Sequence, residues 1–213
     1  DDTITDHSKV GPQTYECLWK LHTKGLWTVI VSGRPAGWAD CLMRLWPIDA
    51  MIFENGAGLM VRDGKKIQTI CLAEKKSLAD QRTHLQNVYD KLKKEIPHLK
   101  VATDQPYRLF DYAIDYIEEE PHLTDAELKR VLEVLEKESQ ITHKLSSIHV
   151  NYWYGKHTKV TACKHLLELQ GEQRGITKDQ IVFSGDSPTD EPLFEYFPHS
   201  VGVANIRRFE AQL

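Results

Sequence analysis

The chain has 213 residues, of which 41% are hydrophobic, so it can bury the core of one large domain or of a core domain with a smaller one. Its net charge of -4 offers no overall basic surface to a nucleic-acid backbone, and no apolar run approaches the roughly 20 residues that span a bilayer. We therefore expect a small-molecule partner, with neither nucleic acid nor membrane; the oligomeric state stays open.

The four cysteines, Cys17, Cys41, Cys71 and Cys163, lie far apart and include no Cys-x-x-Cys pair. Neither a zinc site nor a disulfide framework is indicated. The start of the sequence is acidic and polar, whereas a signal peptide would be basic and then apolar. We therefore expect reduced thiols and a cytoplasmic protein.

The first elements alternate between helix and buried strand. A helix is predicted over 12–23, where apolar side chains recur at helical spacing and Gly25 can end it. Continuous apolar runs predict strands over 26–31 and 50–53, with a second helix over 38–45 between them. This alternation is typical of a parallel, doubly wound α/β sheet.

The composition changes after Gly58, because the following strands alternate apolar and polar residues. The expected elements are a hairpin over 59–70 with its turn at 62–65, helices over 77–95 and 125–138, and half-exposed strands over 110–117 and 147–153. Strands with one wet face fit an α+β insertion better than more parallel sheet. We place this second domain at 58–150.

The parallel pattern then resumes, with a helix predicted over 159–169 and buried strands over 180–183 and 201–203. The fold class is therefore α/β: residues 1–57 and 151–213 form a Rossmann-like core domain, and the α+β domain at 58–150 is inserted as a cap.

The sequence Gly185-Asp186-Ser187-Pro188-Thr189-Asp190 follows one of these strands. The strand delivers Asp186 to the edge of the sheet, and a turn brings Asp190 back beside it. Carboxylates are the hard ligands that Mg2+ prefers. Taken alone, the motif is as consistent with a turn carrying two solvated acids.

Ser32-Gly33-Arg34 ends the strand over 26–31. Ser32 can donate to a phosphoryl oxygen, Gly33 lets backbone N–H groups approach an anion, and Arg34 adds a cation. The alternative is an ordinary strand-to-helix turn with Ser32 as its cap. Asn55, just after the strand over 50–53, is a further candidate for substrate binding.

Lys159 opens a predicted helix, where the helix dipole disfavours a cation. A counter-charge is therefore expected, from a phosphoryl group or from the acidic residues. The alternative is a solvated lysine, and Lys156 is a rival candidate for the same role.

The motifs occur along the chain in the order acid pair, hydroxyl, lysine, acid pair, beginning with Asp1-Asp2-Thr3. In this order they resemble the motifs of the haloacid-dehalogenase-like phosphatases, and the resemblance covers most of the chain. The place of the insertion resembles the capped subgroup that includes sucrose-, trehalose- and mannosylglycerate-phosphate phosphatases and phosphomannomutases. The resemblance implies a Mg2+-dependent phosphatase that hydrolyses a small phosphorylated metabolite, such as a sugar phosphate, through an aspartyl-phosphate.

In that family the first motif is Asp-x-Asp-(Asp or Gly)-Thr, in which the first Asp is the nucleophile and the second is the acid/base. Aligning Thr3 with the motif Thr makes Asp1 the acid/base, and the nucleophile then lies two positions before residue 1. A second register takes Asp1 as the nucleophile and Thr3 in the acid/base place; we prefer the first. The strand that carries this motif is then expected to lie outside the sequence, which would be shorter than the natural chain.

The resemblance assigns a role to each motif residue. Asp1, Ser32, Lys159 and Asp186 are the implied catalytic residues; Asp1, Asp186 and Asp190 the metal ligands; and Thr3, Ser32, Gly33, Arg34, Asn55 and Lys159 the phosphate- or substrate-binding residues.

The predicted strand over 147–153 has one polar face, on which Ser147, His149, Asn151 and Trp153 alternate with apolar residues. This face leads to Lys159, so His149 and Asn151 are predicted to bind sugar hydroxyls. The alternative is that it is only the wet side of a half-exposed sheet.

Two other functions stay open. A phosphomutase or phosphotransferase would pass the phosphoryl group to a second hydroxyl, and a phosphoreceiver or phosphate-binding module would use the acidic pocket for regulation. The large insertion argues against the receiver, because a signalling switch needs no substrate cover. We expect the insertion to be a mobile lid with hinges at 55–58 and 154–155, where glycines tolerate the dihedral changes of closure.

Overall fold

The computed structural model describes residues 2–6, 9–73 and 77–209. One sheet has the order β1-β2-β3-β4, with β1 at Val29–Val31, β2 at Ala50–Phe53, β3 at Gly58–Asp63 and β4 at Lys66–Cys71. β1 and β2 are parallel, whereas β3 is antiparallel to both β2 and β4. A second, parallel pair consists of β9 (Val182–Gly185) and β10 (His199–Gly202).

Helices cover both faces of the first sheet. The helices are α1 (Pro12–Thr23), α2 (Ala36–Leu45), α5 (Lys159–Leu166), α6 (Glu172–Arg174) and α7 (Glu191–Tyr196), with a π-helical stretch at Leu167–Gly171. Along β2, Met51 and Phe53 pack with α1 and α2, while Ala50 and Ile52 pack with α5 and α7. The predicted doubly wound arrangement is therefore confirmed.

The parallel strands are divided between two sheets, in contrast to the single sheet expected. In the described part of the chain, β1 pairs only with β2 and β9 pairs only with β10. The edge of β1 and the edge of β9 line the same cavity, which Leu18 and Leu21 of α1 and Leu166 of α5 also line.

The hairpin β3–β4 corrects one expectation. The sequence assigned it to the insertion, but β3 pairs with β2 along its length, from Ala50 opposite Val61 to Phe53 opposite Gly58. The physical reason is that residues 58–61 of β3 are buried without alternation, as in a strand covered on both faces. By sheet pairing, the second lobe begins after Cys71; the division into two domains otherwise stays a prediction.

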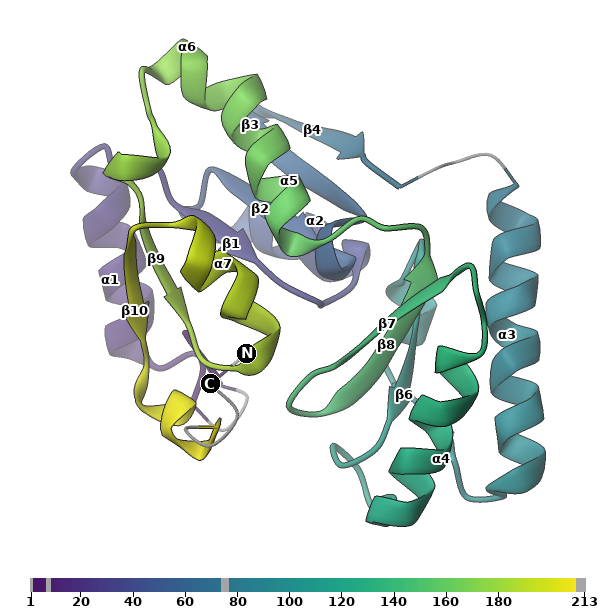
Figure 1. Cartoon of the computed structure of the whole chain (residues 1–213). Helices are drawn as coiled ribbons and strands as arrows, with labels where there is room; N and C mark the ends of the chain where they lie inside the picture. Colours follow the sequence, from purple (N-terminus) through teal and green to yellow (C-terminus); the bar gives the residue numbers. More distant parts are fainter. Residues whose placement is uncertain (1, 7–8, 74–76, 210–213) are drawn as a thin grey trace.

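The second lobe is built on an antiparallel sheet of order β5-β6-β8-β7. Its strands are β5 (Lys100–Val101), β6 (Asp111–Asp115), β7 (Ile141–Leu145) and β8 (His149–Tyr154), and its helices are α3 (Leu78–Glu95) and α4 (Asp125–Glu136). Figure 1 shows this sheet and its two helices as a lobe beside the first sheet. Short 3-10 turns lie at Glu54–Gly56, Gln105–Tyr107, Lys178–Gln180, Pro188–Asp190 and Ala204–Phe209.

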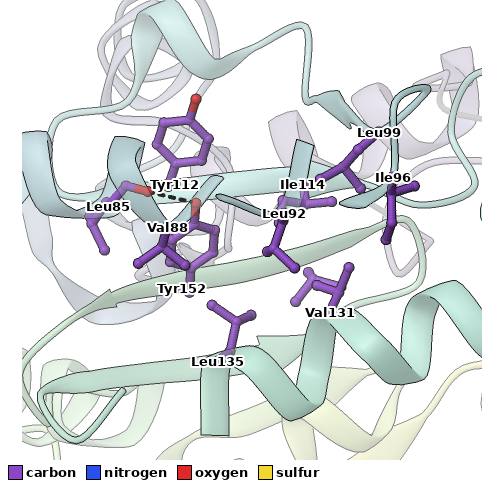
Figure 2. Close-up of a cluster of buried hydrophobic side chains, with 11 residues drawn as sticks. Leu85, Val88, Leu92, Ile96, Leu99, Tyr112, Ile114, Val131, Leu135 and Tyr152 are labelled. Atoms are coloured by element: carbon purple, nitrogen blue, oxygen red, sulfur yellow. Dashed lines mark hydrogen bonds between the residues drawn. The ribbon is translucent and has the colours of Figure 1, made fainter. Parts of the chain in front are cut away.

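One face of this sheet carries the apolar core of the lobe (Figure 2). Leu85, Val88 and Leu92 of α3 and Val131 and Leu135 of α4 pack on Tyr112, Ile114, Val150 and Tyr152. The hydroxyl of Tyr152 donates to the carbonyl of Leu85 at 3.0 Å, so the polar end of this buried ring is satisfied.

The other face of the sheet is buried as well, which corrects the expectation of half-exposed strands. All of β6 and residues 149–153 of β8 are buried. Their polar side chains pair mainly within the second lobe, His149 with Glu118 and Asn151 with Asp111, while Asn55 of the first lobe also reaches Asp111. The alternation of apolar and polar residues therefore assigned side chains to the two faces correctly, but it did not show whether the polar face is exposed to solvent.

The predicted hinge at 55–58 is wrong. Gly58 lies in β3, so this segment joins two strands of one sheet, and it does not connect the lobes. The Glu54 carboxylate accepts hydrogen bonds from the backbone N–H groups of Ala36, Leu109, Phe110 and Asp111 at 2.6–3.0 Å. Gly155, with φ +88°, lies between β8 and α5 and stays a candidate hinge.

Within the described ranges, no helix is both long enough and apolar enough to cross a bilayer. All four cysteines are free thiols, with Cys17 and Cys41 exposed and Cys163 buried.

Candidate functional site

A cavity of about 410 Å³ runs along the edges of β1 and β9 and past their carboxyl ends, where residues of the second lobe also line it. All the predicted site residues that the structure describes line it: Thr3, Ser32, Gly33, Arg34, Asn55, His149, Asn151, Lys159, Asp186 and Asp190. Asp1, the predicted acid/base and metal ligand, lies outside the described residues. Segments far apart in the sequence thus meet at one place.

The acid pair follows β9 directly. The backbone N–H of Asp186 donates to Oδ2 of Asp190 at 3.2 Å, which holds the turn and keeps the two carboxylates close. Gly185 makes this approach possible, because a Cβ there would lie 3.0 Å from the Cβ of Asp190. Thr3 donates its hydroxyl to Oδ1 of Asp186, so the start of the chain reaches the same pair.

The electrostatics of the pair favour a cation. Burial raises the pKa of Asp186 and the negative charge of Asp190 raises it further, against the hydrogen bond from Thr3. Within the described ranges, no cluster of three or more His, Cys, Asp or Glu side chains could hold a metal ion. Two neighbouring carboxylates fit Mg2+, which needs few protein ligands because it retains several waters.

Lys159 is the cation that faces the pair. Its Nζ donates to Oδ1 of Asp190 at 2.8 Å and to the hydroxyl of Thr189 at 3.4 Å, and its side chain is 14% exposed. Asp190 therefore supplies the expected counter-charge. Lys156, the rival, is exposed.

The start of α5 is fixed in a way that positions Lys159. Thr158 caps the helix by accepting from the backbone N–H of Thr161 at 3.2 Å. Gly56, with φ +101°, packs against this cap, because a Cβ there would lie 2.2 Å from the carbonyl oxygen of Thr158. Only glycine allows both the backbone conformation and the contact.

Ser32 and Gly33 form the turn after β1. The Ser32 hydroxyl accepts from the backbone N–H of Arg34 at 3.0 Å, so it caps the turn while lining the cavity. A Cβ on Gly33 would lie 3.0 Å from Oδ1 of Asn55. The glycine thus allows Asn55 to approach the turn.

Arg34 points from this turn toward the second lobe. Its guanidinium pairs with Asp104 at 3.1 Å and with Glu118 at 3.4 Å, and it lies 4.6 Å above the ring of Trp38. The side chain is buried. Arg34 therefore links the two lobes at the edge of the cavity, a role that the sequence did not predict.

A buried charge network, which sequence reasoning missed, lies behind the cavity wall. Arg108 is 1% exposed, forms two hydrogen bonds with Asp104 at 2.9 and 3.0 Å, and contacts both oxygens of Asp111 at 2.9 and 3.0 Å. It also donates to the carbonyl of Gly33 at 3.0 Å. Burial raises the pKa of the Asp111 carboxyl, and the neighbouring Arg108 opposes that rise.

Two amides share that carboxylate. Nδ2 of Asn151 donates to Oδ2 of Asp111 at 3.1 Å, and Nδ2 of Asn55 lies 3.5 Å from the same oxygen. One amide comes from each lobe. In the sequence, the only signal of this network was the spacing of Asp104, Arg108 and Asp111. No local pattern marks these three residues as buried.

His149 is the second polar residue on this face of β8. Its Nε2 lies 2.7 Å from Oε2 of Glu118. The hydrogen bond with His149 is the main cause that lowers the pKa of Glu118 to about 2, and Arg34 adds to the effect against burial. Glu118 therefore joins His149 to Arg34.

Trp153 ends the polar face and stacks on His157, with ring centroids 5.5 Å apart. Trp153 is 1% exposed, and burial lowers the pKa of His157 to about 4. This aromatic pair lies beside the start of α5 in the sequence and connects the polar face to the segment that carries Lys159.

No known protein-family profile and no curated protein matches the sequence. Solved structures do match its fold. A protein from Thermoplasma acidophilum aligns over 97% of this chain and 84% of its own, with a TM-score of 0.72 and 17% identity. The C-terminal domain of the Candida albicans trehalose-6-phosphate phosphatase aligns over 91% of this chain and 68% of its own, with a TM-score of 0.70 and 16% identity.

A third match is the sucrose-phosphatase of Synechocystis, solved with sucrose and phosphate. It aligns over 92% of this chain and 78% of its own, with a TM-score of 0.59 and 18% identity. The chain has the haloacid-dehalogenase-like phosphatase fold. A sugar phosphatase of subclass IIB of this superfamily also matches, at 17% identity and a TM-score of 0.59. The resemblance drawn from the motifs is confirmed at the level of the fold.

Proposed function

We propose that the protein is a Mg2+-dependent phosphatase of a small phosphorylated metabolite, in particular of a sugar phosphate. The observation that carries the proposal is the contact of Lys159 with Asp190 beside Asp186, with Ser32 lining the same cavity. A lysine, a hydroxyl and an acid pair at the ends of parallel strands are the groups that phosphoryl transfer needs.

The residues have separate roles in the proposed reaction. Asp186 and Asp190, with Asp1, would hold the Mg2+, which when bound offsets the negative charge of the phosphoryl group and the carboxylates. Lys159 and Ser32 stabilise the charge on the transferred phosphoryl oxygens. The Arg34 N–H is bonded to the Ser32 hydroxyl, which fixes the oxygen of that hydroxyl in the turn.

The chemical step in this proposal is nucleophilic catalysis. A carboxylate attacks phosphorus, the bond to the ester oxygen breaks, and Asp1 gives its proton to the leaving oxygen. Asp1 then takes a proton from the water that hydrolyses the aspartyl-phosphate. In the preferred register the attacking carboxylate lies two positions before Asp1.

The proposed substrate class rests on the wall opposite the acid pair. His149 and Asn151 are buried on the polar face of β8 and line the cavity, so a substrate held at Lys159 would meet polar groups there. Several structural neighbours are phosphatases of sugar phosphates, which supports the same class.

A phosphate-release screen over sugar phosphates with full-length protein tests the proposal. We expect release with Mg2+ and loss of release in excess chelator. Release that persists in chelator would exclude the metal role. Turnover that appears only with a sugar bisphosphate activator would show a mutase, and binding without turnover would favour a phosphate-binding module.

A further inference from the structure

We propose that Asp111 and Arg108 are positioning residues that orient the amides of Asn55 and Asn151, and that the two amide oxygens then accept hydrogen bonds from hydroxyl groups of the substrate. The inference rests on the proposed function and extends it. It assigns recognition of hydroxyl groups near the phosphate to a pair of amides held by one buried carboxylate.

The orientation of both amides follows from what surrounds Asp111. Its side chain is 0% exposed, and Arg108 donates to both of its oxygens. Because both oxygens of Asp111 accept from Arg108, each amide turns its NH2 group toward Oδ2 of Asp111 and its own oxygen away. Arg108 supplies the positive charge without which a buried carboxylate would be unstable.

The amide oxygens are left for a ligand. Among the described residues, neither Oδ1 of Asn55 nor Oδ1 of Asn151 accepts a hydrogen bond. Neither oxygen is among the fully buried atoms that lack a partner, so neither is sealed from solvent. Both residues line the cavity. Two acceptors without donors favour a ligand that brings donors, and hydroxyl groups are the donors of a sugar.

The same network relates the amides to the phosphate-binding turn. Arg108 donates to the carbonyl of Gly33 at 3.0 Å, and Gly33 packs against Asn55. Asn55 belongs to the first lobe and Asn151 to the second, yet both bind one oxygen of Asp111. The hydroxyl-binding groups are thus held at a fixed place relative to Ser32 and Gly33.

Asp111→Asn tests the role, because the new amide can present either a donor or an acceptor and no longer fixes its neighbours. With glucose 6-phosphate as the probe, we expect the KM to rise about 10-fold while kcat changes less than about 3-fold. Both constants for p-nitrophenyl phosphate, which lacks hydroxyl groups, should stay unchanged. A similar loss on both substrates would overturn the proposal.

A double-mutant cycle separates positioning from general damage. If Asp111 acts through the two amides, then Asp111→Asn should add little to the KM increase already caused by replacing Asn55 and Asn151 together with Ala. An effect of Asp111→Asn that multiplies with that of the double replacement would contradict the proposal. Thermal unfolding of each variant reports any loss of stability separately from the KM.

Proton exchange of the side-chain amides gives a readout that does not need turnover. In the full chain, the Asn55 and Asn151 NH2 groups should be protected, and Asp111→Asn should speed their exchange at least about 10-fold. Asp104→Asn is the matched control: it removes a buried carboxylate from the same Arg108, but Asp104 contacts neither amide. Equal exchange in wild type and Asp111→Asn would overturn the inference.

Failure of the proposed function can be distinguished from failure of this inference. A wild-type protein that releases phosphate from neither ester would contradict phosphatase activity, while protected amides would still support the orienting role of Asp111. Active wild type with unprotected amides would contradict only the further inference.

Discussion

Two groups of buried acids lie near the same cavity, one lining it and the other behind its wall, and they differ in which groups balance their negative charge. In the first group, Asp190 pairs with Lys159, whereas Asp186 accepts from the Thr3 hydroxyl and has its pKa raised by burial. Asp111 is instead surrounded by donors from Arg108, Asn151 and Asn55. On the proposed function the first group supplies negative charge for Mg2+, and on the further inference the second group orients neutral amides. On the proposed function, the first performs chemistry and the second recognises the substrate.

The largest effect expected from this comparison is that of Asp186→Asn. Removing one carboxylate from the acid pair weakens the Mg2+ site, so turnover should fall at least about 10³-fold on both a sugar phosphate and an aryl phosphate. Phosphate release at several Mg2+ concentrations measures it. Asp179→Asn, at an exposed acid before β9, is the control and should change little. Loss of turnover confined to the sugar phosphate would contradict this division, because Asp186 would then act in substrate recognition, as Asp111 is proposed to do.

Lys159→Ala should have the next largest effect, about 10²-fold on kcat, because its Nζ contacts Asp190 and, on the proposed function, would stabilise the phosphoryl group. Lys156→Ala removes an exposed lysine three residues earlier and should stay within about 2-fold. Single-turnover rates on p-nitrophenyl phosphate decide between them. Equal effects of the two substitutions would show that Lys159 is not the cation that stabilises the phosphoryl group.

On the recognition side, replacing His149 and Asn151 together with Ala should raise the KM for a preferred sugar phosphate about 10-fold, with hydrolysis of a small aryl phosphate nearly unchanged. His143→Ala is the matched control: His143 pairs with Tyr152 in the sheet, on the apolar side. Steady-state kinetics on both substrates test this. If both substrates respond alike, or neither does, recognition lies elsewhere.

The smallest effect concerns His157, which stacks on Trp153 between the two groups. Its pKa of about 4 lies below the unfolded value of about 6.5, so the unfolded chain binds the proton first as the pH falls. Stability should therefore be complete above about pH 6.5 and decrease toward pH 4, by up to about 2 kcal/mol at pH 5.

His157→Phe keeps the stacking but cannot titrate, so its loss of stability between pH 7.5 and pH 5 should be smaller than that of the wild type. Urea unfolding at the two pH values measures the difference. His165→Phe, at a half-exposed site on α5, is the control. Parallel losses in wild type and His157→Phe would contradict the assignment.

The sequence predicted what depends on local pattern. Apolar runs located β2 residue for residue and β9 to within two residues, and the polar motifs after them meet at the cavity. The prediction that β9 and β10 are buried is wrong, because most of their residues are exposed or half-exposed. What it could not predict depends on partners distant in the chain. Asn55 and Asp111 are 56 positions apart, and the buried state of the polar face follows from such contacts. The hairpin β3–β4 was assigned to the inserted domain for the same reason. The alternation of apolar and polar residues does not show that β3 pairs with β2.

The Glu54 carboxylate also has a consequence for folding. It collects four backbone N–H groups, one from the start of α2 and three from residues 109–111 just before and within β6. A fully buried acid is stable in this place only while both lobes are formed, since unfolding of the second lobe would remove the donors at residues 109–111 and leave only the Ala36 N–H. The two lobes should therefore unfold in a single cooperative transition, with the same midpoint for probes in α2 and in β6.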